Sequence, residues 1–349
     1  MSGPGEFMRP STDWQEKVEP GEAEHFEAYA QELRALQHRN ARSGKLSRAL
    51  HAKGPPGLEA TFSVLPNLPE HARPGLFAAP ASYRAYVRFS NGSGGHHPDA
   101  RKDVRGIAIK LLGVKGKKII PGMEDATTQD FLLITSPATP VSNADEFLGL
   151  LRVVASPLTG LPKFVRQVGL GRFLKIAKQG GKSLSVPTIS VATRPYYSAL
   201  PIQFGEYAVK YALKPHQHSE PGARRGSGAD YLRDELEERL RRGPLSFDFQ
   251  VQFYVDEQRT PIEDAAVEWR ESDAPFVTLA RLDLPKQDLA SPRGQRLQEY
   301  VERLSFDPWH ALNEFRPLGN MMRARNVAYR VSTQERKAAP EPDGAERFD

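Results

Sequence analysis

The chain has 349 residues, 39% of them hydrophobic, and its lack of cysteine excludes disulfides, thiolate zinc sites, iron–sulfur clusters and a cysteine nucleophile. The net charge of +5 is spread along the chain rather than gathered in one basic stretch with interleaved aromatic residues, which argues against nucleic-acid binding. The chain shows neither an apolar run long enough to cross a bilayer nor a secretory signal, so we expect a cytoplasmic protein.

The first half of the chain is expected to contain one helix followed by several strands. Residues 1–7, which precede a second Met, resemble residues left by an expression vector, and we expect the whole of 1–20 to be flexible. An apolar stripe that begins at Phe26 predicts a helix over 22–42. Strand-like runs follow over 61–65, 83–91, 104–112 and 130–135.

The second half mixes helices with further strands. Helical patterns cover 144–155, the basic amphipathic segment 161–178, the charged segment 229–242, and 321–337, and a segment over 298–304 precedes the turn-rich stretch before the last helix. Period-two alternation predicts strands over 207–213, 247–255 and 276–284. We therefore expect an α+β domain over 21–337, in which helices pack outside an antiparallel sheet or barrel, and a disordered tail over 338–349.

The first segment with chemical interest is Arg48-Ala-Leu-His51-Ala-Lys-Gly54, before the first strand. On composition alone, His51 is more simply a solvent-exposed loop histidine, because histidine is often found at surfaces. A functional role for it needs support from a second segment.

The second segment is the terminal helix, which Asn320 is placed to cap. Arg325, Tyr329 and Arg336 are spaced so that they lie on one face of it. A guanidinium one turn from a phenol stabilises the phenolate, which a free tyrosine with a pKa near 10 does not form at neutral pH. Taken alone, however, the helix also fits a basic surface helix whose tyrosine packs on the core.

Together, the two segments resemble the haem catalase superfamily, in its branch of small catalase-related proteins close to the allene oxide synthases. The similar motifs are Arg48-x-x-His51-Ala-Lys-Gly54, Val87-Arg88-Phe89-Ser90, Asp103-x-Arg105-Gly106-x-Ala108-x-Lys110, and Arg325-x-x-x-Tyr329 with Arg336 seven residues on. The likeness covers 45–137 and 245–337, and the motifs follow the family's order. It implies an antiparallel β-barrel with surrounding helices and a haem b buried between the barrel and the C-terminal helix.

The resemblance also implies roles for individual residues. His51 would be the distal general base, and Ser90 would hydrogen-bond its imidazole. Tyr329 would be the axial ligand of the iron, and Arg325 would keep it ionised. The remaining haem-binding residues would be Arg48, Arg88 and Arg336, of which the first and last match residues that pair with the propionates.

One departure from the family concerns the distal side. Catalases carry an asparagine there, shortly before two phenylalanines, and this chain has none in the matching stretch Thr127–Leu133. Thr128 aligns with the asparagine if one insertion is allowed, and Gln129 is its neighbour. Either is therefore a candidate for the missing hydrogen bond to the peroxide.

The departures bear on substrate and partners. We expect decomposition of hydrogen peroxide, of organic (fatty-acid) hydroperoxides, or of both, because the family's threading arm and C-terminal domain are reduced or missing. The basic segment 161–178 is either a packed surface helix or a surface that meets anionic lipid or a fatty-acid carboxylate. By family likeness we expect a homo-oligomer, a dimer or tetramer. The alternatives are a fatty-acid hydroperoxide isomerase or dehydratase of the allene oxide synthase type, a non-enzymatic haem binder, and a relative that has lost haem.

Overall fold

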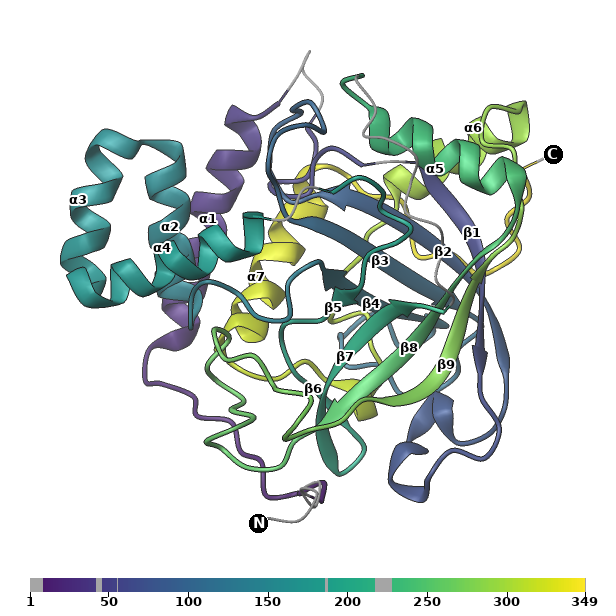
Figure 1. The fold of residues 1–349 in the computed structure, drawn as a ribbon, viewed down its shortest axis with the longest axis horizontal. Coiled ribbons are helices and arrows are strands. Elements are labelled where there is room, and N and C mark those ends of the chain that lie inside the picture. The colour runs from purple at the N-terminus through teal and green to yellow at the C-terminus, as the bar shows by residue number, and fades with distance from the viewer. Residues whose placement is uncertain (1–8, 42–45, 55, 186–187, 217–227, 349) are drawn as a thin grey trace, which may run out of the picture.

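The centre of the molecule is an antiparallel β-barrel (Figure 1). The computed structural model describes residues 9–41, 46–54, 56–185, 188–216 and 228–348. Within them the sheet order is β5-β4-β3-β2-β1-β9-β8-β7-β6, and pairing of β5 with β7 closes eight strands into a ring, with β6 added beside β7. The bounds are β1 Gly57–Val64, β2 Ser82–Asn91, β3 Arg105–Leu112, β4 Thr128–Ile134, β5 Tyr196–Tyr197, β6 Ile202–Phe204, β7 Tyr207–Pro215, β8 Leu245–Phe253 and β9 Val277–Leu284. The antiparallel barrel predicted from the sequence is confirmed.

The barrel interior is filled by aromatic and aliphatic side chains from alternate positions of the strands. Phe62, Phe131 and Phe249 are fully buried, and their ring centroids are 4.9–6.2 Å apart. Because side chains alternate across a strand, the neighbouring residues point away from this core. On β2, β3 and β4 those outward positions form the surface on which the site is built.

Seven helices among the described residues lie outside the barrel (Figure 1). Their bounds are α1 Glu22–Arg39, α2 Ala144–Ala155, α3 Pro157–Val168, α4 Leu170–Ser185, α5 Tyr231–Arg242, α6 Pro292–Arg303 and α7 Asn320–Glu335, with short 3-10 turns at Glu70–Ala72, Gly75–Phe77 and Asn313–Phe315. Helix α7 lies between the barrel and α1, α2 and α3 lie on the far side of α1, and α4 runs from there back toward the barrel. None of the described helices combines the length and hydropathy needed to span a membrane.

The expected helix over 161–178 is two helices rather than one. The chain turns at Gly169, whose φ of 80° lies in the left-handed region that favours glycine, and α3 and α4 pack as neighbours.

The prediction that Asn320 caps α7 is also wrong. Gly319 is the N-cap, while Asn320 is the first helical residue and its side chain accepts a hydrogen bond from the backbone of Ala144 in α2 at 2.9 Å.

Both expected flexible ends are packed against the body where the structure describes them. Near the N-terminus, Trp14 donates to the carbonyl of Glu206 at 2.9 Å, and Glu16 pairs with Arg316 and Arg323. At the other end Phe348 is buried among residues of β2 and α6. The polar composition that predicted disorder is used here in ion pairs with the body of the protein.

The tail contributes to a buried ionic cluster on the outer face of the barrel. Lys110 on β3 and Asp130 on β4 face each other with both side chains fully buried, and their charged atoms are 2.8 Å apart. Glu341 reaches the same ammonium at 2.6 Å and also lies 3.2 Å from His310. Burial and Lys110 would lower the pKa of His310, but hydrogen bonds to Asp130 and Glu341 raise it to about 9. The cluster is therefore stabilised by a charged imidazole.

We expect the stability of the protein to fall as the pH rises from about 6.5 to about 9. The folded-state pKa of His310 exceeds its ordinary value, so its contribution is complete below pH 6.5 and lost as the pH passes 9. The loss should be on the order of 3 kcal/mol. Urea unfolding at several pH values should show it in the natural chain and a smaller fall in His310→Gln, and equal falls in both would contradict it.

Candidate functional site

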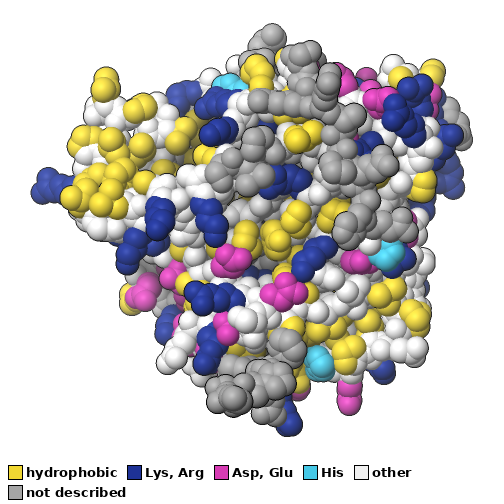
Figure 2. All heavy atoms as spheres, in the orientation of Figure 1, with side chains coloured by type: hydrophobic (Ala, Val, Ile, Leu, Met, Phe, Trp, Pro, Cys, Tyr) yellow, Lys and Arg dark blue, Asp and Glu magenta, His cyan; other side chains and the backbone are white. Residues whose placement is uncertain are grey.

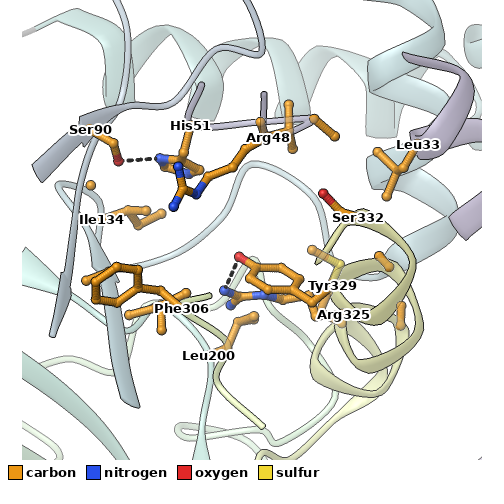
Figure 3. Close-up of a pocket in the computed structure, with 18 of the residues that line it drawn as sticks. Leu33, Arg48, His51, Ser90, Ile134, Leu200, Phe306, Arg325, Tyr329 and Ser332 are labelled. Atoms are coloured by element: carbon orange, nitrogen blue, oxygen red, sulfur yellow. Dashed lines mark hydrogen bonds between the residues drawn. The ribbon is translucent and has the colours of Figure 1, made fainter. Parts of the chain in front are cut away.

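A cavity of about 260 Å³ lies between the outward face of β2, β3 and β4 and helix α7. From the strands it receives Arg88 and Ser90, Gly106 and Ala108, and Leu132 and Ile134, and from α7 it receives Arg325 and Tyr329, with Arg336 directly after the helix. Its remaining walls are mostly apolar and include Leu33, Leu50, Phe147, Leu148, Leu200 and Phe306. Figure 3 shows His51 and Ser90 on one side of this space, and Tyr329 with Arg325 on the opposite side.

His51 is held in place by its backbone and by Ser90. Its φ of 55° is unusual for a residue with a side chain, and its N–H donates to the carbonyl of Gly92 at 3.1 Å. Imidazole Nδ1 lies 2.9 Å from Ser90 Oγ. Because Nδ1 is occupied in this way, Nε2 is the nitrogen that remains for the cavity.

Gly106 leaves the space that the imidazole fills. It pairs with Ser90 across β2 and β3, and a Cβ atom at this position would lie 2.8 Å from Ser90 Oγ and 2.9 Å from His51 Nδ1. Such distances are too short for any side chain larger than hydrogen. This contact gives a physical reason for the glycine in the Arg105-Gly106 pair of the third motif.

The surroundings of His51 keep its imidazole neutral. Burial and the positive charge of Arg88 lower the pKa of His51 to about 4. A neutral imidazole can accept a proton at neutral pH, which is what a general base requires.

On the opposite side, one face of α7 presents a phenol with a cation beside it. Arg325 Nη2 donates to the hydroxyl oxygen of Tyr329 at 2.9 Å, as their separation by one helical turn predicts. Burial would lower the pKa of Arg325, but the negative charge that Tyr329 can carry outweighs it and raises that pKa. A phenol oxygen beside a permanent cation is a suitable ligand for a ferric iron.

Three arginines gather at one side of the cavity around a single carboxylate. Arg48 and Arg88 both bind Glu302 on α6, the latter through Nε at 2.8 Å, while Arg336 donates to the carbonyl of Leu304 at 2.7 Å. Burial and the charges of the other arginines lower the pKa of Arg48 to about 9. Positive charge therefore exceeds negative charge here, and the position favours an anionic ligand group.

The structure places Thr128 and Gln129 away from the cavity. Thr128 Oγ1 donates to Glu341 at 2.6 Å, in the ionic cluster, and Gln129 accepts from the backbone of Leu312 at 2.8 Å. Thr128 precedes Leu132, a wall residue, by four positions, which is about 13 Å along a strand. Leu132 and Ile134 supply the β4 part of the wall, so the expected replacement for the asparagine is not found at either residue.

The other site residues expected from the sequence do meet. His51, Ser90, Arg48, Arg88, Arg325, Tyr329 and Arg336 all line the one cavity. The sequence analysis missed Glu302 and Phe306. Glu302 looks like one more charge on a solvated helix, and only its two arginine partners distinguish it. Phe306 lies in a turn-rich stretch that carries no periodic signal.

Comparisons with known proteins agree with this geometry. No family model matches the chain. The catalase-related peroxidase of Mycolicibacterium paratuberculosis (strain ATCC BAA-968 / K-10) is 26% identical over 307 residues, which cover 83% of this chain and 88% of that protein. The sequence likeness therefore extends well beyond the motifs.

Among solved structures, similar folds are found in catalases. A bacterial catalase superposes with a TM-score of 0.61 at 19% identity over 88% of this chain, a fungal catalase with 0.65 at 16% over 96%, and catalase A from Saccharomyces cerevisiae with 0.65 at 15% over 97%. The chain spans only 60%, 66% and 69% of the lengths of these three proteins. These likenesses confirm the catalase fold, and the sequence likeness to the catalase-related peroxidase supports the resemblance to the haem catalase superfamily.

We expect His51 to titrate near pH 4 and to stay neutral above about pH 5, because burial and Arg88 oppose its protonation. The test is NMR of protein with 13C-labelled histidine, in which a His51→Gln variant identifies the signal among the nine histidines. A midpoint between about pH 6 and 7, the range of an unperturbed histidine, would contradict the geometry described here.

Proposed function

We propose that this chain, a relative of the haem catalases, is a haem-dependent peroxide enzyme in which His51 acts as the distal base and Tyr329 as the iron ligand. The observation that carries the proposal is one cavity with two opposite sides. A neutral imidazole fixed by Ser90 faces a phenol fixed by Arg325. Neither pair has an evident structural purpose without a ligand between them.

The residues of the cavity fit a haem in three respects. The Tyr329 oxygen is a hard anionic donor with its charge supported by Arg325. The walls between the two sides are largely apolar, as a porphyrin ring requires. The surplus of guanidinium charge from Arg48, Arg88 and Arg336 suits the two propionates, since arginine binds carboxylates through two parallel hydrogen bonds.

A haem iron bound in this cavity would supply the redox chemistry that breaks the O–O bond of a peroxide. The protein's own part is proton movement. His51 Nε2 receives the proton of the incoming hydroperoxide, and its low basicity lets it return that proton to the departing oxygen. Ser90 holds the ring in place through Nδ1 during both transfers. The apolar walls limit water near the reacting group.

The β4 wall favours organic hydroperoxides over hydrogen peroxide as substrates. Leu132 and Ile134 place alkyl groups at the edge of the cavity, whereas Thr128 is occupied by Glu341. On the side formed by α1 and α2, Leu33, Phe147 and Leu148 extend the apolar lining. An alkyl or acyl chain gains from this lining, while hydrogen peroxide has only polar groups to offer.

Replacing His51 with alanine should lower peroxide turnover by a factor on the order of 10²–10⁴, the range for loss of a general base. The variant should still bind haem, because Tyr329 and the arginines remain. Stopped-flow consumption of a hydroperoxide, normalised to the haem absorbance, measures the effect. Unchanged turnover in the haem-loaded variant would contradict the proposed role of His51. If the natural chain binds haem but does not turn over peroxide, the protein is a non-enzymatic haem binder.

Replacing Tyr329 with phenylalanine should weaken haem binding by more than about tenfold, since it removes the donor oxygen and leaves the ring. Titration of the protein with haemin, followed by the Soret band, measures the affinity. Tyr300→Phe is the matched control, because the Tyr300 hydroxyl lies outside the cavity and bonds Glu346 at 3.1 Å. Equal affinity in Tyr329→Phe and the natural chain would point to another ligand.

With the haem-loaded protein, we expect slow oxygen release from hydrogen peroxide and faster consumption of a polyunsaturated fatty-acid hydroperoxide. The apolar wall from Leu132 and Ile134 is the reason. Oxygen electrode and absorbance assays run in parallel measure the two rates, and product analysis separates reduction from isomerisation or dehydration. Rapid oxygen release with an inert lipid hydroperoxide would instead identify a compact catalase.

A further inference from the structure

The outer end of the α2–α4 region exposes large apolar side chains that no described part of the chain covers. Leu158 is 93% exposed, Val154 68%, Leu170 63% and Leu174 58%. Single exposed leucines are common, but a group of them on adjoining helices is not. Figure 2 shows hydrophobic side chains gathered over this end of the molecule, with lysine and arginine side chains beside them.

The charge of the same two helices has one sign. Between residues 157 and 185 the chain contains lysine and arginine but no aspartate or glutamate. Arg172 is used internally, in a pair with Glu146 of α2 at 2.7 Å. By contrast Lys163, Arg166, Lys175 and Lys178 are exposed. The surface formed by these four cations and the exposed residues Val154, Leu158, Leu170 and Leu174 is called the α3–α4 surface below.

We propose that the α3–α4 surface docks on the headgroup region of an anionic lipid bilayer. Apolar side chains flanked by cations on helices of modest length are what an interfacial helix needs, because the leucines enter the acyl boundary while the cations bind lipid phosphates. Figure 1 shows that α3 and the beginning of α4 lie at the outer end of the molecule, away from the barrel, where a flat surface can reach them.

Charge decides between this occupant and the alternatives. A second copy of the chain bound through the same face would bring like charges together, because a two-fold interface is formed by the same patch on both copies. A nucleic acid would require aromatic side chains among the cations for base stacking, whereas Phe164 is buried and the large apolar side chains exposed on this surface are aliphatic. An anionic bilayer offers phosphates to the cations and an acyl region to the exposed leucines.

The α3–α4 surface lies next to a helix that lines the cavity, so docking would bring the cavity close to the membrane. Helix α2, on which α3 packs, also carries Phe147 and Leu148, which line the cavity. Docking would therefore turn the α2 side of the cavity toward the membrane, where hydroperoxides of fatty acyl chains are found. The docking itself does not depend on peroxide chemistry, and its test is independent of turnover.

The experiment is co-sedimentation of the whole chain with vesicles of phosphatidylcholine that contain either no or about 30% phosphatidylglycerol. We expect binding to the anionic vesicles only. It should weaken when salt rises from about 0.1 M to about 1 M, because the screening length falls from about 10 Å to about 3 Å. Leu158→Ser/Leu174→Ser should weaken binding at least about tenfold. Lys175→Ser/Lys178→Ser should weaken it about 30-fold at low salt, about fivefold for each lysine.

Matched controls replace similar residues elsewhere. Val18→Ser removes an apolar side chain that is 65% exposed outside the α3–α4 surface, and Lys115→Ser/Lys117→Ser removes two exposed cations on the loop after β3. Both should bind as the natural chain does, as should His51→Ala, which tests the proposed chemistry separately. Because the substituted leucines are exposed, melting temperatures should be unchanged and loss of binding cannot be ascribed to misfolding.

Three results would overturn the proposal. The first is an absence of sedimentation with anionic vesicles. The second is loss of binding in the controls equal to that in the α3–α4 variants. The third is a natural chain that ignores vesicles while Leu158→Ser/Leu174→Ser reduces its oligomeric state in analytical ultracentrifugation, which would assign the surface to a contact between copies.

Discussion

The alternation of side chains along β2, β3 and β4 determines where this protein can bind a ligand. One set of positions fills the barrel with phenylalanine, valine and isoleucine, so the other set must lie outside it. Because the strands pair in register, the outward residues form rows across the sheet. One row holds Ser90 and Gly106, the next Arg88 and Ala108, and the one after that Tyr86 and Lys110. The first two rows belong to the cavity and the third to the ionic cluster.

Different segments of the chain pack over these rows of outward-facing residues. The cavity rows are covered by α7, which brings Arg325 and Tyr329 to face His51. The row with Lys110 is covered by the C-terminal tail, which supplies Glu341. The buried ammonium of Lys110 already pairs with Asp130, and Glu341 adds a second carboxylate at 2.6 Å, so the tail is part of the folded body. The same sheet face thus combines a ligand site with a permanently closed charge cluster.

Most of the elements could be predicted from the sequence because their periods are local properties. The helix over 144–155 and the longer strands of the barrel were expected within a few residues of their observed bounds, whereas the short strands β5 and β6 were not expected. The meeting of His51 with Tyr329 is not a local property, and only the resemblance to the catalases predicted it. The distance of Thr128 from the cavity was missed, because matching the motif assigns the residue to a strand but does not show how far along the barrel it lies. Glu341 was missed because a Pro- and Glu-rich tail has no pattern that reveals a distant lysine partner.

The contact between Lys110 and Glu341 joins residues 231 positions apart in the chain. During synthesis, β1 to β4 leave the ribosome before α7 and the tail, which cover their outer face, have been made. The outer face of β3 therefore stays open to water until α7 and the tail have been made. Truncated chains that stop before residue 341 would retain every strand of the barrel, but the buried Lys110–Asp130 pair would lack Glu341 as its further partner, and the outer face of β3 would be left uncovered for quality-control proteases.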